Sequence, residues 1–165
     1  LTGFTAGIYN AELTAQFGNW NRKYKLGIVC DSSTGFILPN GAIRSPDVSW
    51  IAKERVARFS KEEKAKFLPL TPDFALELMS PSDRSEDTQA KMTSDPASTQ
   101  GARERARMKE YQDNGVKLGW LINPQLQQVE IYHQDGSIKA INKPDVLSGR
   151  DLLPNLEIEL DFIWE

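Results

Sequence analysis

The sequence predicts an α/β fold in which a central mixed β-sheet is flanked by α-helices. Three observations support this prediction: a helical apolar stripe near the N-terminus, several short apolar runs bounded by turn residues, and a helical segment between these runs. Strand runs that alternate with single helices favour a sheet with one helix on each face. The sequence contains no internal repeat and no glycine-rich phosphate loop.

The first half of the chain is predicted to contain one long helix and three short strands. The helix spans residues 6–25, and its apolar side chains recur every three or four residues to form one stripe, made of Tyr9, Leu13, Phe17, Trp20 and Tyr24. Strands at 26–30 and 36–38 follow, separated by the turn sequence SSTG. A third strand at 45–51 is entered through Pro46.

The second half is predicted to add a buried strand, a helix and a hairpin. Residues 53–67 are charged and helix-prone, which indicates a surface excursion. The run FALELM at 74–79 has the length and composition of a buried strand. A helix then ends on a glycine cap at Gly115, and strands within 116–124 and 127–136 follow in hairpin relation.

Composition limits the functions that this chain can have. Its 165 residues, 39% apolar and 26% charged, are typical of one globular domain spanning 1–165. A single cysteine, Cys30, and a single histidine, His133, exclude a disulfide framework and a Cys/His zinc site within one chain. No run approaches a membrane span and no signal pattern is present, so the cytoplasm is the expected compartment.

The net charge of −3 argues against phosphate binding over the whole surface, although a local basic patch remains compatible with it. The chain begins at Leu1 rather than at methionine. We therefore expect an N-terminally shortened form of a longer protein.

Two acidic residues stand out because each is the only acid within a short apolar strand. Glu77 interrupts the run FALELM, and Asp47 opens the strand that contains Val48 and Trp50. A buried carboxylate is costly unless it is paired, hydrogen-bonded or bound to a metal. If the two strands are neighbours, both carboxylates converge on one cation, and few carboxylates with retained water are typical of Mg²⁺. The structural alternatives are a turn role for Asp47 and a solvent-facing position for Glu77.

Four segments resemble a known family. RSPDVSWI, PDFALELMSPSD, KEYQDNGVKLGWLINP and QQVEIY are similar, in this order, to the Uma-type endonucleases of the PD-(D/E)XK superfamily. The resemblance extends from NAE at Asn10 to the final DFIW. It implies a restriction-endonuclease-like fold and Mg²⁺- or Mn²⁺-dependent hydrolysis of DNA phosphodiester bonds. Since nucleases of this type commonly pair to cut both strands, it also suggests a homodimer.

The resemblance assigns roles to individual residues. Asp47 matches the acid of the PD half-motif and Glu77 matches the second acid; in the superfamily these two hold the metal. The backbone carbonyl two residues after the second acid often helps, and here it belongs to Met79. Glu12, within NAE, is a weaker candidate for holding metal or water, with a solvated helix position as its alternative.

The expected lysine departs from the superfamily pattern. It should fall two residues after the second acid, where this chain has Met79. The Uma-type family resembles those members of the superfamily in which the lysine has moved to the next helix, four residues before a tyrosine. Counting back from Tyr111 gives Arg107, whose guanidinium stabilises charge but does not act as a base.

Residues 93–108 resemble an insertion. Removing them joins Lys91-Met92 to Lys109 and restores the family pattern, with Lys91 four residues before the tyrosine. Two arrangements remain open: the helix begins near Gly101 with Arg107 or Lys109 facing the site, or Lys91 reaches the site and the insertion forms a loop. A solvated helix face is the structural alternative for these charges.

Two functional hypotheses follow from the sequence, and a third hypothesis opposes both of them. The first is a Mg²⁺-dependent DNA endonuclease. The second is a catalytically inactive, nuclease-derived module that binds nucleic acid or protein. The third is a dimeric interaction domain without a site, in which the acids are exposed.

Overall fold

The computed structural model describes residues 1–79 and 100–165, and its centre is a six-stranded mixed sheet. β5 and β6 run parallel, and every other neighbouring pair in the sheet is antiparallel. In spatial order the strands are β1 (Gly27–Asp31), β4 (Val48–Ala52), β5 (Phe74–Leu78), β6 (Leu118–Asn123), β7 (Gln128–His133) and β8 (Ile138–Asn142). The predicted α/β class is confirmed.

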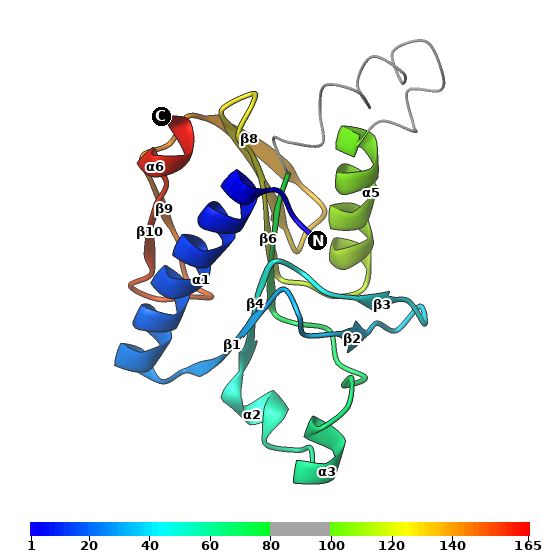
Figure 1. Cartoon of the computed structure of the whole chain (residues 1–165). Helices are drawn as coiled ribbons and strands as arrows, with labels where there is room; N and C mark the ends of the chain where they lie inside the picture. Colours follow the sequence, from blue (N-terminus) through cyan, green and yellow to red (C-terminus); the bar gives the residue numbers. More distant parts are fainter. Residues whose placement is uncertain (80–99) are drawn as a thin grey trace.

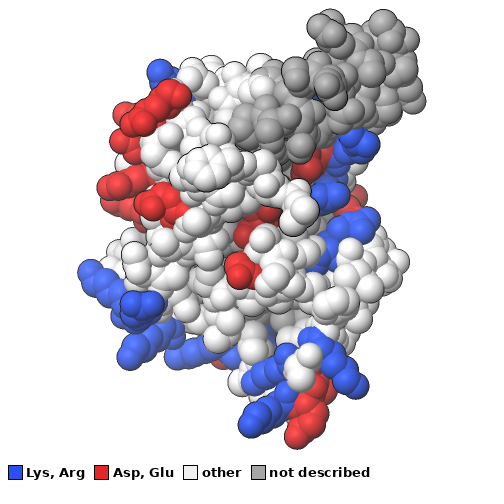
Figure 2. All heavy atoms as spheres, in the orientation of Figure 1, with Lys and Arg blue, Asp and Glu red and all other residues white. Residues whose placement is uncertain are grey.

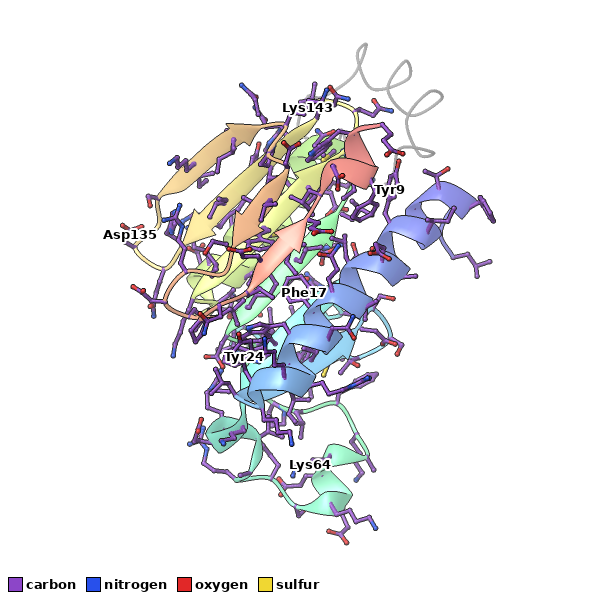
Figure 3. All side chains as sticks on the ribbon, turned by 90° about the vertical axis from the view of Figure 1, so that its left-hand side faces the viewer. Tyr9, Phe17, Tyr24, Lys64, Asp135 and Lys143 are labelled. Atoms are coloured by element: carbon purple, nitrogen blue, oxygen red, sulfur yellow. The ribbon has the colours of Figure 1, made fainter. Side chains whose placement is uncertain are left out.

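Two helices cover opposite faces of this sheet. Figure 1 shows α1 (Phe4–Tyr24) on one side and α5 (Gln100–Asp113) on the other. On the α1 side, Phe17 packs against Phe74 and Trp120, with ring centroids 5.1 and 5.9 Å apart, and Figure 3 shows Phe17 directed from α1 toward the sheet. The apolar stripe predicted for the first helix is therefore its buried face.

The α5 side has its own core, which contains Met108 and Tyr111 from the helix and Ala75 and Leu121 from the sheet. The helix ends as predicted, since Gly115 follows it with φ of +104°, a left-handed conformation that glycine adopts readily.

Smaller elements surround the sheet. They are β2 (Phe36–Ile37), β3 (Ile43–Arg44), α2 (Lys53–Val56), α3 (Lys61–Lys64), β9 (Val146–Ser148), β10 (Glu157–Glu159) and α6 (Asp161–Trp164). Residues 53–67, here called the α2–α3 arm, are largely exposed, in agreement with the predicted surface excursion. A capping box between Ser60 and Glu63 starts α3. None of the helices in the described ranges is long and apolar enough to cross a membrane.

The sequence analysis did not predict β3 or β8. β3 contains only two residues, which is too short for a periodic signal. β8 is the edge strand of the sheet, and four of its five residues are exposed. An edge strand with little burial lacks the alternation that identifies a half-buried strand.

Candidate active site

The sheet register brings the two predicted acids together. Antiparallel pairing of β4 with β5 places Val48 opposite Leu76 and Ser49 opposite Ala75. Extending this register by one residue places Asp47, which directly precedes β4, opposite Glu77. Glu77 is two residues after Ala75, which belongs to the α5-side core, so the Glu77 side chain points to the α5 side of the sheet. Asp47, opposite Glu77, points to the same side.

Asp47 is fixed by the backbone of the neighbouring strand. Its Oδ2 atom accepts a hydrogen bond of 2.7 Å from the backbone N–H of Leu78. The Asp47 and Glu77 carboxyls are close enough to influence each other's pKa. The structural alternative of a solvent-facing Glu77 is contradicted by its burial, and Asp47, besides ending a turn, is hydrogen-bonded to the backbone of β5.

Glu77 is almost completely buried, with 4% of its surface exposed. Its Oε1 atom accepts a hydrogen bond of 2.7 Å from the Tyr111 hydroxyl, which comes from α5 on the same side of the sheet. Tyr111 is itself 1% exposed. The Tyr111 hydroxyl holds one oxygen of the Glu77 carboxyl in place, so a residue of α5 fixes the orientation of this carboxyl.

Burial raises the pKa of both carboxyl groups. Burial raises the pKa of Asp47 against the opposing effects of the hydrogen bond from Leu78, of Glu77 and of the Arg107 charge. Burial, together with the nearby Asp47, raises the pKa of Glu77 well above its usual range, although the Tyr111 hydroxyl opposes this. The pair thus retains a proton at a pH where separate, solvated carboxyls would be ionised.

Arg107 is the predicted cation that the structure places near this pair. Burial lowers the pKa of its guanidinium, but attraction by Glu104, Glu77 and Asp47 outweighs that effect and the pKa is raised. An ion pair of 3.8 Å connects Arg107 to Glu104, one helical turn earlier. The Arg107 side chain keeps 44% of its surface exposed, so its positive charge lies at the border between the carboxyl pair and solvent.

The other predicted site residues have different positions. Lys109 points away from the pair, because its side chain is 54% exposed and its Nζ lies 3.0 Å from Asp113. Lys91 lies outside the described residues. Glu12 is exposed on α1, which covers the opposite face of the sheet, so the structure does not bring it to the carboxyl pair. Met79 follows β5 directly and is buried on the α5 side.

The structure also decides part of the question about residues 93–108. From Gln100 onward they belong to α5, as the hypothesis of a helix starting near Gly101 requires, while 93–99 lie outside the described ranges. Helical phase explains why Arg107 rather than Lys109 approaches the acids. Met108 and Tyr111 are buried against the sheet, and Arg107 is one turn before Tyr111.

Sequence reasoning missed two contributors to the site. Tyr111 served only as a reference point for spacing, yet its hydroxyl contacts Glu77. Glu104 was not considered, although it pairs with Arg107 and adds negative charge near Glu77. The signal for both was the spacing of three and four residues from Arg107, which places all three on adjacent turns of one helix.

The donor set suits a divalent cation. The neighbouring carboxyl groups of Asp47 and Glu77 have raised pKa values, and a cation between them would replace the proton that the pair retains. Hard oxygen ligands in small number, completed by water, are the preference of Mg²⁺. Among residues 1–79 and 100–165, no cluster of three or more His, Cys, Asp or Glu side chains could hold a metal ion. A cation here would therefore depend on these two carboxyls, backbone oxygen and water.

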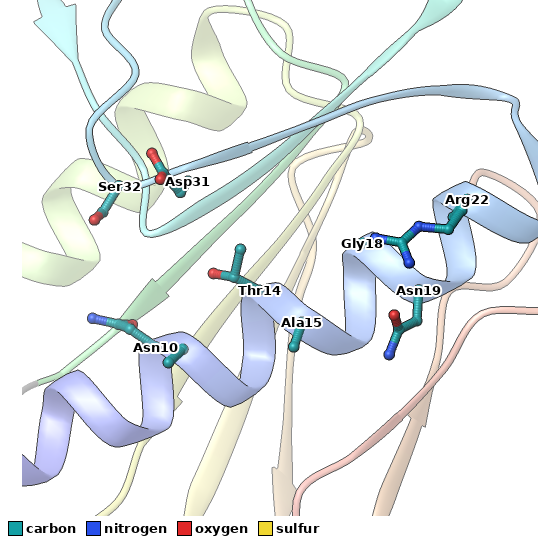
Figure 4. Close-up of a pocket in the computed structure, with 9 residues that line it drawn as sticks. Asn10, Thr14, Ala15, Gly18, Asn19, Arg22, Asp31 and Ser32 are labelled. Atoms are coloured by element: carbon teal, nitrogen blue, oxygen red, sulfur yellow. The ribbon is translucent and has the colours of Figure 1, made fainter.

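A polar groove of about 570 Å³ lies on the other face, between α1 and the end of β1. Figure 4 shows Asn10, Thr14 and Arg22 from α1 facing this groove together with Asp31 and Ser32. Asp31 pairs with Val48, whose side chain belongs to the α1-side core. Asp31 thus faces the α1 side of the sheet, whereas Asp47 faces the α5 side.

Comparison with known proteins supports the predicted family. The structure is similar to a crystal structure described as "a putative nuclease belonging to DUF820 from Anabaena variabilis ATCC 29413", with a TM-score of 0.70 and 16% identity. The match covers 94% of this chain and 77% of the other, and at this identity it shows a shared fold. No protein with a curated description matches the chain. The model of the Uma2 family, described as "Putative restriction endonuclease", matches residues 2–161. The chain therefore belongs to the Uma2 family, as the sequence motifs predicted.

Proposed function

We propose that this protein is a metal-dependent nuclease that hydrolyses phosphodiester bonds in DNA. The observation that carries the proposal is that the strand register places the half-buried Asp47 opposite the buried Glu77 on one face of the sheet, with Leu78 N–H and the Tyr111 hydroxyl holding the two carboxyls. The family match and the nuclease-like fold support the same class of activity.

Asp47 and Glu77 would hold Mg²⁺, or Mn²⁺ in its place, with the backbone carbonyl of Met79 as a further ligand. When bound, the cation would neutralise charge on the phosphodiester and make a nearby water more acidic. The protein residues fix the geometry of this site. Leu78 N–H orients Asp47 and the Tyr111 hydroxyl orients Glu77, so neither carboxyl needs to reorganise when a cation arrives.

Arg107 would stabilise the negative charge of the phosphate. Its guanidinium stays protonated throughout the pH range in which nucleases act, so it cannot accept the proton of an attacking water. Its partly exposed position beside the buried acids would let it reach a phosphate at the surface of the site. This role is electrostatic, and a donor of this kind contributes about 10²–10³ in rate.

The decisive experiment measures cleavage of supercoiled plasmid DNA by the purified chain with Mg²⁺ or Mn²⁺. We expect Glu77→Gln and Asp47→Asn to reduce the rate by more than roughly 100-fold, since even outer-shell partners of metal ligands contribute about 10- to 100-fold. Glu62→Gln removes an exposed acid of α3 and is the matched control. If Glu77→Gln cleaves DNA as fast as the parent protein, the assignment is wrong.

A second pair of variants separates the two candidate cations of α5. Arg107→Gln should slow cleavage by about 10²–10³, whereas Lys109→Gln should leave it unchanged because Lys109 faces Asp113 and solvent. Equal losses in both variants would mean that the helix presents general positive charge to DNA, and would contradict the specific role of Arg107.

The inactive, nuclease-derived binding module remains the second candidate, because Met79 occupies the position at which the superfamily places its lysine. Calorimetric titration with Mn²⁺ distinguishes the two. Metal binding that disappears in Asp47→Asn, combined with DNA cleavage, supports the nuclease. Metal binding without cleavage, or DNA binding without metal, supports the module.

The proposal extends to a homodimer, in which two copies would each cut one DNA strand. Sedimentation velocity of the chain with and without a short DNA duplex tests this extension. A monomer under both conditions would contradict it and leave the proposed site unaffected.

A further inference from the structure

A second cavity, distinct from the carboxyl pair, lies between the edge strand β1 and the α2–α3 arm. Its volume is about 310 Å³, at the lower end of the range of about 300–1,000 Å³ for small-molecule sites. Most of its walls are apolar and come from Ile28, Phe36, Ile51, Val56, Leu68 and Leu70. The proposed catalytic residues Asp47, Glu77 and Arg107 do not line it.

The mouth of this cavity carries positive charge. Lys64, at the end of α3, and Lys66, just beyond it, both line the cavity and are exposed. Within the described parts of the chain, neither lysine forms an ion pair with a carboxylate. Figure 3 places Lys64 at the end of the molecule formed by the α2–α3 arm, and Figure 2 shows Lys and Arg side chains at this end together with a smaller number of acidic ones.

Exposed apolar side chains surround the same mouth. Ile28 is 42% exposed and Phe67 is 54% exposed. The Phe67 ring lies directly over Gly35, where an added Cβ would come within 2.8 Å of ring carbon Cδ1. Glycine thus makes room for an aromatic ring at the entrance. Exposed apolar groups that continue into an apolar cavity are typical of binding sites rather than of ordinary surface.

Besides the two lysines, the cavity lining contains few polar side-chain groups, namely the thiol of Cys30 and the hydroxyl of Thr34. Burial raises the pKa of the Cys30 thiol, and the nearby Thr34 and Ser49 hydroxyls oppose this shift. The interior therefore offers little to a polar ligand group. A ligand would gain most by placing apolar atoms inside and an anionic group at the lysines.

We propose that this cavity binds an amphipathic organic anion, with its apolar chain between β1 and the α2–α3 arm and its carboxylate between Lys64 and Lys66. Chemical complementarity carries the proposal: an apolar interior with few polar side chains, and at its entrance two lysines that form no ion pair with a carboxylate of residues 1–79 or 100–165. The proposal is independent of the nuclease site, since different residues form the two.

The single cysteine provides the test. Cys30 lines the cavity, so a bound ligand should shield its thiol from alkylation by iodoacetamide. We expect octanoate to slow this alkylation in a saturable manner. Octylammonium, which has the same chain and the opposite charge, should protect far less at equal concentration. Octanol measures the contribution of the chain without charge.

Variants then locate the anionic group. The double variant Lys64→Gln, Lys66→Gln should bind octanoate roughly tenfold more weakly while its octanol protection stays unchanged, because partly exposed ion pairs contribute modestly and both are lost. Lys61→Gln, on the same short helix but outside the cavity, is the matched control. Val56→Phe should fill the cavity and remove protection by all three compounds, while the parent circular dichroism spectrum is retained.

The results that overturn the proposal are specific. Absence of protection by octanoate would show that the cavity does not take this ligand class. Equal protection by octylammonium, or full octanoate affinity in the double lysine variant, would show that the lysines do not select an anion. DNA cleavage is not part of the readout, so the outcome does not depend on the proposed nuclease activity.

Discussion

Replacing Tyr111 with phenylalanine removes one hydroxyl group from the protein interior and leaves the ring in place. The lost interaction is the hydrogen bond of 2.7 Å from this hydroxyl to Glu77 Oε1. Both residues are nearly inaccessible to solvent, at 1% and 4% exposure, so water does not replace the bond. The ring remains packed, and the variant therefore tests the hydrogen bond rather than a cavity.

The free-energy cost should depend on whether Glu77 is ionised. A hydrogen bond to a charged group contributes about 1.5–3 kcal/mol, and one between neutral groups about 0.5–1.5 kcal/mol. The Tyr111 hydroxyl opposes the upward shift of the Glu77 pKa, which means that it favours the ionised carboxyl. We therefore expect Tyr111→Phe to cost about 0.5–1.5 kcal/mol at low pH and about 1.5–3 kcal/mol once Glu77 has ionised.

The sign of the pH dependence follows from linkage. The folded-state pKa of Glu77 is raised, so this group supports the fold below its unfolded-state pKa, and that support is lost as the pH rises through the folded-state value. Without the hydroxyl, the folded-state pKa rises further and more stability is lost. Tyr111 does not titrate in this range, because burial and the adjacent Glu77 raise its own pKa.

The assay is urea unfolding followed by tryptophan fluorescence at pH 5 and pH 9, with a chelator to exclude metal ions. Tyr132→Phe is the matched control, since it removes a hydroxyl that donates to Glu130 at 2.8 Å on the same side of the sheet. Arg105 already pairs with Glu130 at 2.9 Å, so this change should cost less. A cost of Tyr111→Phe that is equal at both pH values, or smaller at pH 9, would refute the reasoning.

Three further substitutions test the fold and the site by urea unfolding. Glu77→Gln, measured without metal, should raise the free energy of unfolding at pH 8. It should also reduce the loss of stability that the parent protein shows between pH 5 and 9. If this loss is the same in the variant, Glu77 does not cause it. Asp73→Ala should cost about 3–5 kcal/mol, because this carboxylate is 1% exposed and paired with an arginine at 2.9 Å and a lysine at 3.4 Å; a loss under 1 kcal/mol would contradict a structural role. Gly27→Ala should cost about 1–3 kcal/mol, since its Cβ would collide with the backbone carbonyl oxygen of Ile51 on β4, whereas Gly7→Ala in open space on α1 should stabilise by about 0.5–1 kcal/mol; the reverse order would exclude the close approach of β1 to β4 at this position.

The fold could be predicted from the sequence where burial imposes a pattern. The stripe of Leu13, Phe17 and Trp20 predicted α1 because one face of the helix had to be apolar. The central strand β5 was predictable because it is buried along its whole length. β8 was not, because an exposed edge strand is under no such constraint.

The proximity of Asp47 and Glu77 could be predicted as a possibility, because each interrupts an apolar strand. Their proximity in the structure depends on the β4–β5 register, which no local signal in the sequence specifies. The choice between Arg107 and Lys109 depended on the phase of α5, which is set by the burial of Met108 and Tyr111 against the sheet. The Tyr111–Glu77 hydrogen bond joins residues 34 positions apart and becomes visible only when that packing is known.

The carboxyl pair is better explained by function than by stability. Two carboxyl groups held close together on one face of a sheet, with Glu77 buried, are costly for the fold, and apolar side chains of similar volume would be more stable there. The adjacent Leu76 and Leu78 show that this strand is otherwise built from such side chains. Local violations of packing rules are expected where a site needs them. A divalent cation would turn the repulsion between Asp47 and Glu77 into shared attraction, and this would account for an arrangement that costs the metal-free fold stability.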